Sequence, residues 1–192
     1  MIPLNYVNTV TISGLIHHLS RKKNNSYFPF SIRHENLWSD GTTRKDFLNA
    51  RAFPKDVQEK LSALEENTPV LVKGSLRSSK GSGELFLAVT DAEVLSELTE
   101  PVNSVTLSGN VHVIKAQNEG ENGTGKYTRF AVRQEYPDTG RDFIVVRVYN
   151  DNGNPLREKL ALKNDNDNVT VEGTLRSSRG SGVNYVRCSK ID

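Results

Sequence analysis

A ten-residue segment occurs twice in this chain of 192 residues, and no other feature limits the fold as strongly. The segment GSLRSSKGSG at 74–83 returns as GTLRSSRGSG at 173–182, which is 99 positions later. A second pair, VNTVTISG at 7–14 and VNSVTLSG at 102–109, lies 95 positions apart. A period near 100 residues is too long for a solenoid repeat and fits a duplicated small domain. We therefore expect domains at 1–95 and 102–192, joined by a linker at 96–101.

The composition describes a polar globular protein, with 35% hydrophobic and 25% charged residues. No apolar run reaches the length of a membrane span, and the N-terminus lacks the pattern of a signal peptide. We expect a cytoplasmic protein with no membrane association. The only cysteine, Cys188, excludes an internal disulfide and a paired-cysteine metal site, and we expect no cofactor and no metal. The net charge of +2 permits an acidic partner without demanding one.

Each repeat shows the same order of elements. Apolar residues at every second position predict strands at 10–16, 26–34 and 45–53, and then a short helix that begins at Pro54 and strands that begin at 70 and 84. The second repeat predicts strands at 105–111, 126–134 and 141–149, a helix after Pro155, and strands from 169 and 183. This is the order of the five-stranded OB barrel, which binds its ligand across strands two and three. We expect an all-β chain of two tandem five-stranded OB-fold barrels, with one short helix per unit.

The third strand of each repeat places large side chains on its outer face. Because side chains alternate along a strand, a core face of Leu48, Ala50 and Ala52 turns the residues between them outward. The outward residues include Phe47, Arg51 and Phe53. The second repeat places Phe143, Arg147 and Tyr149 at the matching positions. Aromatic rings on either side of an arginine are therefore predicted on the outer surface of both barrels.

These segments together resemble the bacterial single-stranded-DNA-binding protein family. The opening motif, the six-residue spacing of the two rings on strand three, and the Val-x-Val-x-Gly-x-Leu-Arg segment all follow the family's pattern. The resemblance implies a non-enzymatic protein that binds single-stranded DNA in replication, recombination or repair, encoded by a bacterium, phage or plasmid. Two barrels per chain resemble the minority form that pairs to reach four, so a homodimer and a monomer are equally compatible with the sequence.

Two departures from the family limit what the resemblance implies. Gly81 and Gly180 stand where the family commonly carries a stacking tryptophan. The chain ends at Asp192 directly after strand five, so recruitment of replication or repair proteins through an acidic tail is not expected.

The candidate binding residues divide into rings for bases and cations for phosphates. Trp38 joins the four strand-three rings as a further platform, with Tyr136 as its looser counterpart. Arg51 and Arg147 are assigned to phosphate contact or guanidinium stacking. Four residues of the turn after strand four are expected to follow the nucleic-acid backbone: Arg77, Lys80, Arg176 and Arg179. His17 and His112 hold equivalent outward positions and are predicted to be plain surface histidines.

Other interpretations remain open at this point. The repeated turn could be only a flexible hairpin, and the outward rings could pack under a loop or in a dimer contact. The barrels could bind mainly protein partners, as a primosomal, plasmid or phage replication accessory, or they could bind RNA. Residues 120–126 match the start of a phosphate-binding loop, but a strand follows where that motif needs a helix. No catalytic arrangement recurs in both repeats, so we expect no enzyme.

Overall fold

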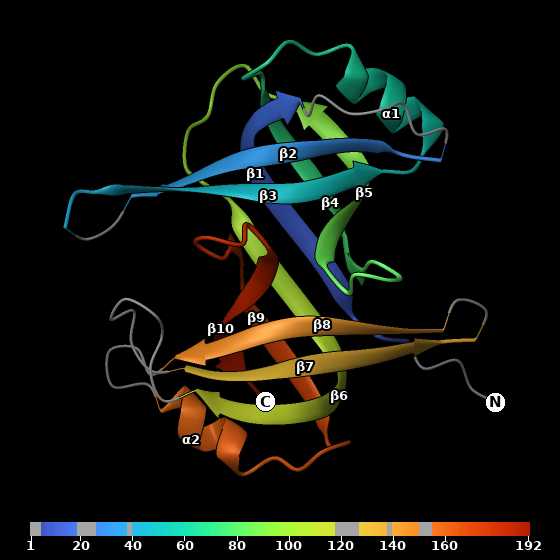
Figure 1. The fold of residues 1–192 in the computed structure, drawn as a ribbon. Coiled ribbons are helices and arrows are strands. Elements are labelled where there is room, and N and C mark those ends of the chain that lie inside the picture. Colours follow the sequence, from blue (N-terminus) through green and yellow to red (C-terminus); the bar gives the residue numbers. More distant parts are fainter. Residues whose placement is uncertain (1–4, 19–25, 38–39, 118–126, 138–139, 150–154) are drawn as a thin grey trace. The chain divides into compact units, whose positions relative to one another are not determined.

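The computed structural model describes residues 5–18, 26–37, 40–117, 127–137, 140–149 and 155–192 (Figure 1). Contacts divide the chain into two compact units. The N-terminal unit comprises Thr9–Ser104 and Arg176–Asn184, and the C-terminal unit comprises Met1–Asn8, Val105–Leu175 and Tyr185–Asp192. Each unit thus includes a short segment that lies in the other repeat by sequence. The linker at 96–101 stays a prediction.

The N-terminal unit is built around a closed five-stranded barrel. Its strands are β1 (Asn8–His18), β2 (Phe28–Leu37), β3 (Thr43–Ala52), β4 (Pro69–Ser78) and β5 (Leu85–Val94). Strand β1 pairs with both β2 and β4, β2 pairs with β3, and β4 pairs with β5, all antiparallel. The parallel pair of β3 and β5 closes the ring. Helix α1 (Lys55–Ser62) follows Pro54, buries Val57 and Leu61, and lies beside β3 and β5 (Figure 1).

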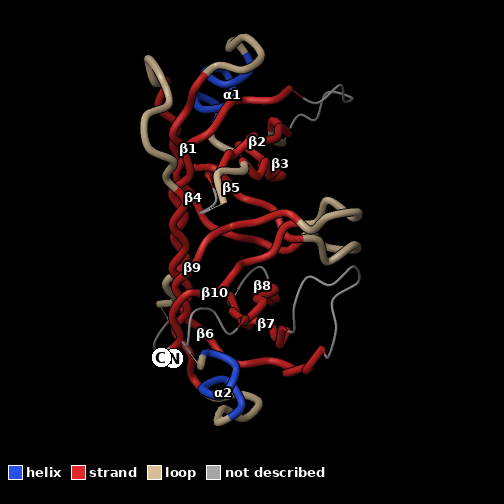
Figure 2. Tube along the Cα trace, turned by 90° about the vertical axis from the view of Figure 1, so that its left-hand side faces the viewer, coloured by secondary structure: helices blue, strands red, loops and turns tan. Residues whose placement is uncertain are grey.

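The C-terminal unit repeats this arrangement. Its strands are β6 (Asn103–Gln117), β7 (Tyr127–Tyr136), β8 (Gly140–Tyr149), β9 (Asn168–Ser177) and β10 (Asn184–Ile191), with α2 (Leu156–Ala161) between β8 and β9. Strand β6 pairs with β7 and β9, and β8 pairs with β7 and, in parallel, with β10. Figure 2 shows that strands dominate both units, and the helices described in them, α1 and α2, are short. The predicted order of elements and the all-β barrel class are therefore confirmed.

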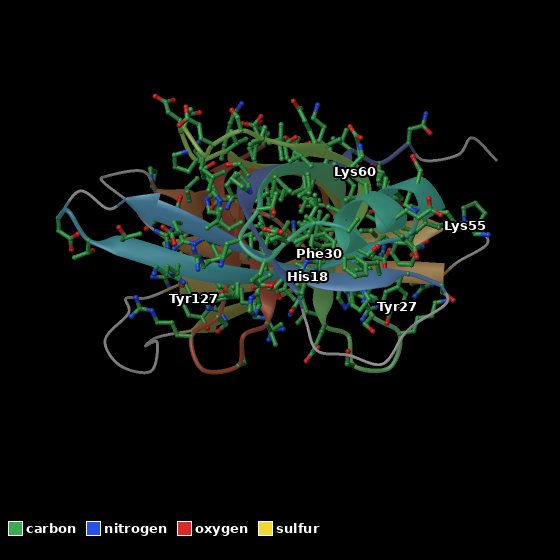
Figure 3. The ribbon with its side chains drawn as sticks, turned by 90° about the horizontal axis from the view of Figure 1, so that it is seen from above. His18, Tyr27, Phe30, Lys55, Lys60 and Tyr127 are labelled. Carbon is green, nitrogen blue, oxygen red and sulfur yellow. The ribbon has the colours of Figure 1, made fainter. Side chains whose placement is uncertain are left out.

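The inner faces of the strands form the cores. Leu48, Ala50 and Ala52 on β3 are buried, as are their counterparts Ile144, Val146 and Val148 on β8. Phe30 and Phe130 are completely enclosed, and Phe30 lies among the side chains inside its barrel (Figure 3). The alternation predicted for the third strands is confirmed, so their other residues face outward.

Glycines shared by both repeats mark places where two backbones nearly touch. A Cβ added to Gly74 would overlap the carbonyl oxygen of Ala88, and one added to Gly173 would overlap that of Arg187. Strand β4 also shifts its register against β5 between Lys73 and Gly74. A strand glycine often permits such a close approach, and here it lets β4 and β9 lie against β5 and β10.

Alanine at either glycine should therefore destabilise its barrel. We expect Gly74→Ala and Gly173→Ala each to cost about 1–3 kcal/mol or more, because the overlapping atom is backbone and cannot rotate away. Chemical denaturation followed by circular dichroism measures the loss. Lys73→Ala, at the exposed neighbouring position, is the control and should stay within about 0.5 kcal/mol. Equal midpoints for Gly74→Ala and Lys73→Ala would contradict the expected overlap.

The repeated ten-residue segments comprise the last five residues of β4 and of β9 and most of the tight turns that lead to β5 and β10. Gly81 and Gly83 have φ of +101° and +72°, and Gly180 and Gly182 have φ of +92° and +70°. Glycine adopts these angles without the cost that a Cβ would add. The backbone conformation of the turn thus explains why glycine occupies these positions. It does not explain why the neighbouring positions are basic.

None of the helices described here is both long enough and apolar enough to cross a membrane.

Candidate nucleic-acid interface

Two aromatic rings stand out on the outer face of the N-terminal barrel. Phe47 and Phe53, on and just after β3, are 46% and 43% exposed. Single exposed apolar side chains are ordinary, whereas large exposed rings on the same side of one barrel indicate a contact surface. They lie on the surface of β2 and β3, where OB barrels bind their ligands.

The guanidinium of Arg51 lies over two further rings near Phe53. The guanidinium carbon of Arg51 lies 4.0 Å from the ring centroid of Phe86 and 4.8 Å from that of Tyr27. The ring of Phe53 lies 5.5 Å from Tyr27 and 6.3 Å from Phe86, between centroids. Tyr27 directly precedes β2 and is labelled in Figure 3. We call Tyr27, Phe47, Arg51, Phe53 and Phe86 the N-terminal ring face.

The C-terminal barrel builds the same arrangement with tyrosines. The guanidinium carbon of Arg147 lies 4.0 Å from the ring centroid of Tyr185 and 5.0 Å from that of Tyr127. The rings of Tyr127 and Tyr149 are 5.3 Å apart. A second arginine, Arg187, lies 4.2 Å from the Tyr149 centroid. The C-terminal ring face consists of Tyr127, Phe143, Arg147, Tyr149 and Tyr185, with Arg187 over it.

Sequence reasoning missed four of these rings, although the repeat carries a signal for each. Tyr127 follows Tyr27 by 100 positions, the same offset that relates Phe130 to Phe30. Tyr185 follows Phe86 by 99 positions, the offset of the repeated turn. An aromatic residue kept in both copies on strand five was therefore visible. Its place beside strand three became apparent only once the parallel pairing was known.

The two histidines lie against the other strand-three rings. The ring centroids of His17 and Phe47 are 5.7 Å apart, and those of His112 and Phe143 are 4.8 Å apart. Nδ1 of His17 also contacts the carboxylate of Glu66, whose pKa is lowered by a hydrogen bond from the backbone of His18 and by its contact with His17. Both histidines thus support a ring of the face.

The four cations predicted on the repeated turns have different surroundings. Lys80 and Arg179 are exposed, and Arg77 is half-buried. Arg176 is only 8% exposed, and its Nε donates to Asp46 at 3.0 Å within the N-terminal unit. A buried arginine that is neutralised by a buried carboxylate holds the turn in place, and this geometry argues against the phosphate contact predicted for Arg176.

The turn of the second repeat lines a cavity of about 570 Å³ in the N-terminal unit, to which it belongs by its contacts. Phe47 and Asn49 of β3 line one side, and the turn at 177–182 lines the other. Arg44, Lys45 and Arg179 also line it. Arg44 contacts Asp46 at 3.4 Å and Lys45 contacts Glu35 at 3.9 Å, so part of this positive charge is already compensated.

Trp38 lies outside the described residues, so its predicted role as a platform stays a prediction. Its looser counterpart, Tyr136, packs edge-on against Tyr6 with centroids 6.2 Å apart and donates its hydroxyl to Gln134 at 2.7 Å.

The described residues offer little for redox or metal chemistry. Burial raises the pKa of the Cys188 thiol to about 12, and Sγ donates to the carbonyl of Lys190 at 3.3 Å. A thiol with so high a pKa is a poor nucleophile. No cluster of three or more His, Cys, Asp or Glu side chains suited to a metal occurs in the part of the chain that the structure describes. Flat rings and guanidinium groups are what both barrels present.

Comparison with known proteins bears on this geometry. No protein-family model matches the sequence, and no curated protein matches it. The wild-type single-stranded DNA binding protein from Thermus aquaticus matches in structure with a TM-score of 0.74 and 16% sequence identity, over 97% of this chain and 92% of that chain. The chain shares the fold of that protein. A deletion mutant of the same Thermus aquaticus protein matches with a TM-score of 0.73, also at 16% identity, over 97% of this chain and 94% of that chain.

Proposed function

We propose that this chain binds single-stranded DNA without catalysing a reaction, and that it protects or organises exposed strands in replication, recombination or repair. One observation carries the proposal: an arginine flanked by aromatic rings recurs on the outer face of strand three in both barrels, with Tyr27, Arg51 and Phe86 in one and Tyr127, Arg147 and Tyr185 in the other. A fold shared with a single-stranded DNA binding protein supports it.

The chemistry of the two ring faces suits an unpaired strand. Its bases are free to stack, and an exposed ring holds a base without reading its identity. Each such stack contributes roughly 1–3 kcal/mol, whereas an exposed charge pair contributes about 1 kcal/mol or less. Phe47, Phe53, Phe143 and Tyr149 are therefore proposed as the main source of affinity. Lys80 and Arg179 add phosphate contacts at the turns.

A titration of labelled oligo(dT), followed by fluorescence anisotropy, tests the proposal. We expect binding at about 50 mM salt that weakens steadily as salt rises, because each phosphate contact releases a counterion. No binding under these conditions would refute the proposal. Competition with a duplex and with oligo(U) of equal length distinguishes the nucleic acid, and a preference for the duplex or for RNA would redirect the proposal to that ligand.

A protein-binding role is the second candidate, and the turns favour it. Gly81 and Gly180 leave both turns without an aromatic ring. Each barrel can therefore stack bases on its strand-three rings but not on its turn, which reduces its total stacking area. If the barrels serve mainly to bind replication proteins, oligo(dT) affinity will not depend on the rings. The homodimer with four barrels and the cytoplasmic location belong to the proposal as well, and light scattering tests the former.

A further inference from the structure

Three arginines stand in one row across the outer face of the C-terminal barrel. Strand register places Arg129 of β7 opposite Arg147 of β8, and Arg147 opposite Arg187 of β10. Neighbouring strands are about 4.8 Å apart, so the row spans about 10 Å of the surface. Arg129 is exposed and the other two are half-buried. All three lie on the ring face.

The same row in the N-terminal barrel contains a single arginine. Pro29 of β2 lies opposite Arg51 of β3, and Arg51 lies opposite Ala88 of β5. Arg51 and Arg147 are therefore equivalent, while Arg129 and Arg187 stand where the other repeat has proline and alanine. Because the two barrels are repeats, equivalent positions can be compared directly, and the N-terminal row shows the arrangement without the two additional arginines.

The row concentrates three guanidinium groups on a short stretch of the surface. Like charges directly opposite each other on adjacent strands destabilise a sheet. Two of the guanidinium groups are nevertheless held over rings, Arg147 at 4.0 Å from the Tyr185 centroid and Arg187 at 4.2 Å from the Tyr149 centroid. A guanidinium held over a ring stays close to the barrel surface, and its N–H groups match two oxygens of a phosphate.

We infer that Arg129 and Arg187, together with Arg147, form a phosphate-binding strip on the C-terminal ring face that the N-terminal ring face lacks. A single strand whose bases stack on Phe143 and Tyr149 passes its phosphodiester backbone over the strip. The two ring faces therefore contribute unequally to the salt-dependent part of binding, with the larger share from the C-terminal ring face, and Lys80 and Arg179 add their contacts at the turns. This inference rests on the proposed function and specifies which residues provide the electrostatic part of the affinity for single-stranded DNA.

The double variant Arg129→Gln with Arg187→Gln tests the strip in the full chain. The probe is a fluorescein-labelled oligo(dT) of about 32 nucleotides, which covers the largest site of two OB folds. Each lost phosphate contact lowers the slope of log affinity against log salt by about 0.7 for a single strand. We expect the slope to fall by about 1.4, so that the variant loses about sevenfold less affinity than wild type between about 50 and 200 mM salt.

Two matched variants separate the strip from general charge. Arg141→Gln with Lys190→Gln removes two charges from the same unit, at residues paired with Glu135 and Asp192, and should leave the slope unchanged. Arg129→Lys with Arg187→Lys keeps the charge and should also keep the slope. An unchanged slope in the glutamine variant of the row, or an equal fall in the Arg141 and Lys190 control, would overturn the strip and leave the proposed function intact. Failure of wild type to bind would overturn both.

Discussion

Replacement of Phe47, Phe53, Phe143 and Tyr149 by alanine is expected to lower the affinity for oligo(dT) by about a thousandfold or more. Each ring stacked on a base contributes roughly 1–3 kcal/mol, and about 1.4 kcal/mol corresponds to a factor of ten. The effect exceeds that of any single cation because water and salt screen exposed charges and leave stacking nearly unaffected. Anisotropy titration at fixed salt measures it.

A matched control for this variant lies away from the ring faces. Leu162 follows α2 and is 84% exposed, so Leu162→Ala removes exposed apolar surface without touching a ring. Its affinity should equal that of wild type. Circular dichroism of the four-ring variant should remain that of the folded protein, because all four side chains lie outside the cores. If the folded variant keeps the wild-type affinity, the rings serve protein contacts and the second candidate function replaces the first.

Phe30→Ala is expected to destabilise the N-terminal unit by about 3–5 kcal/mol, whereas Phe47→Ala should cost about 1 kcal/mol or less. Both positions hold phenylalanine on neighbouring strands of one barrel. Phe30 is completely buried and Phe47 is 46% exposed, so only the first substitution leaves a cavity. The two variants should therefore have opposite phenotypes. Phe30→Ala loses stability, whereas Phe47→Ala loses affinity for oligo(dT).

Trp38 gives a local probe for this comparison. It is the only tryptophan of the chain and lies in the N-terminal repeat, so its fluorescence during denaturation follows that unit. A shift in the fluorescence midpoint for Phe30→Ala, with no shift for Phe47→Ala, is the expected result. Equal shifts would mean that Phe47 contributes to stability like a core residue, and its assignment to base stacking would be wrong.

Local patterns explain which parts of the fold were predictable. Strand alternation has a period of two, so a buried run of Leu48, Ala50 and Ala52 determines the outward direction of Phe47 and Arg51 without any tertiary information. The repeat then confirms the assignment, because the same parity recurs at Ile144 and Val146. The element order follows from the same alternation and from Pro54 and Pro155 at the helix starts.

The burial of Arg176, one of the four cations predicted on the turns, was not predictable in the same way. Arg77 and Arg176 occupy identical positions in nearly identical segments, yet Arg176 is buried against Asp46. Asp46 is 130 positions away in sequence, and its carboxylate also accepts hydrogen bonds from the backbone and hydroxyl of Ser177. An ion pair over that separation depends on how the chain folds back, and no local pattern encodes it.

The amino-acid sequence alone determined that two similar units exist, that each is a barrel of five strands, and which strand-three residues face outward. These conclusions rest on period and order, which are properties of neighbouring residues. Only the tertiary structure decided which residues share the ring faces. Strands three and five pair in parallel across a closed barrel, and their register follows from the closure of the whole ring of strands. That register brings Arg51 beside Ala88 and Arg147 beside Arg187, and it therefore separates a ring face with one arginine from a ring face with three.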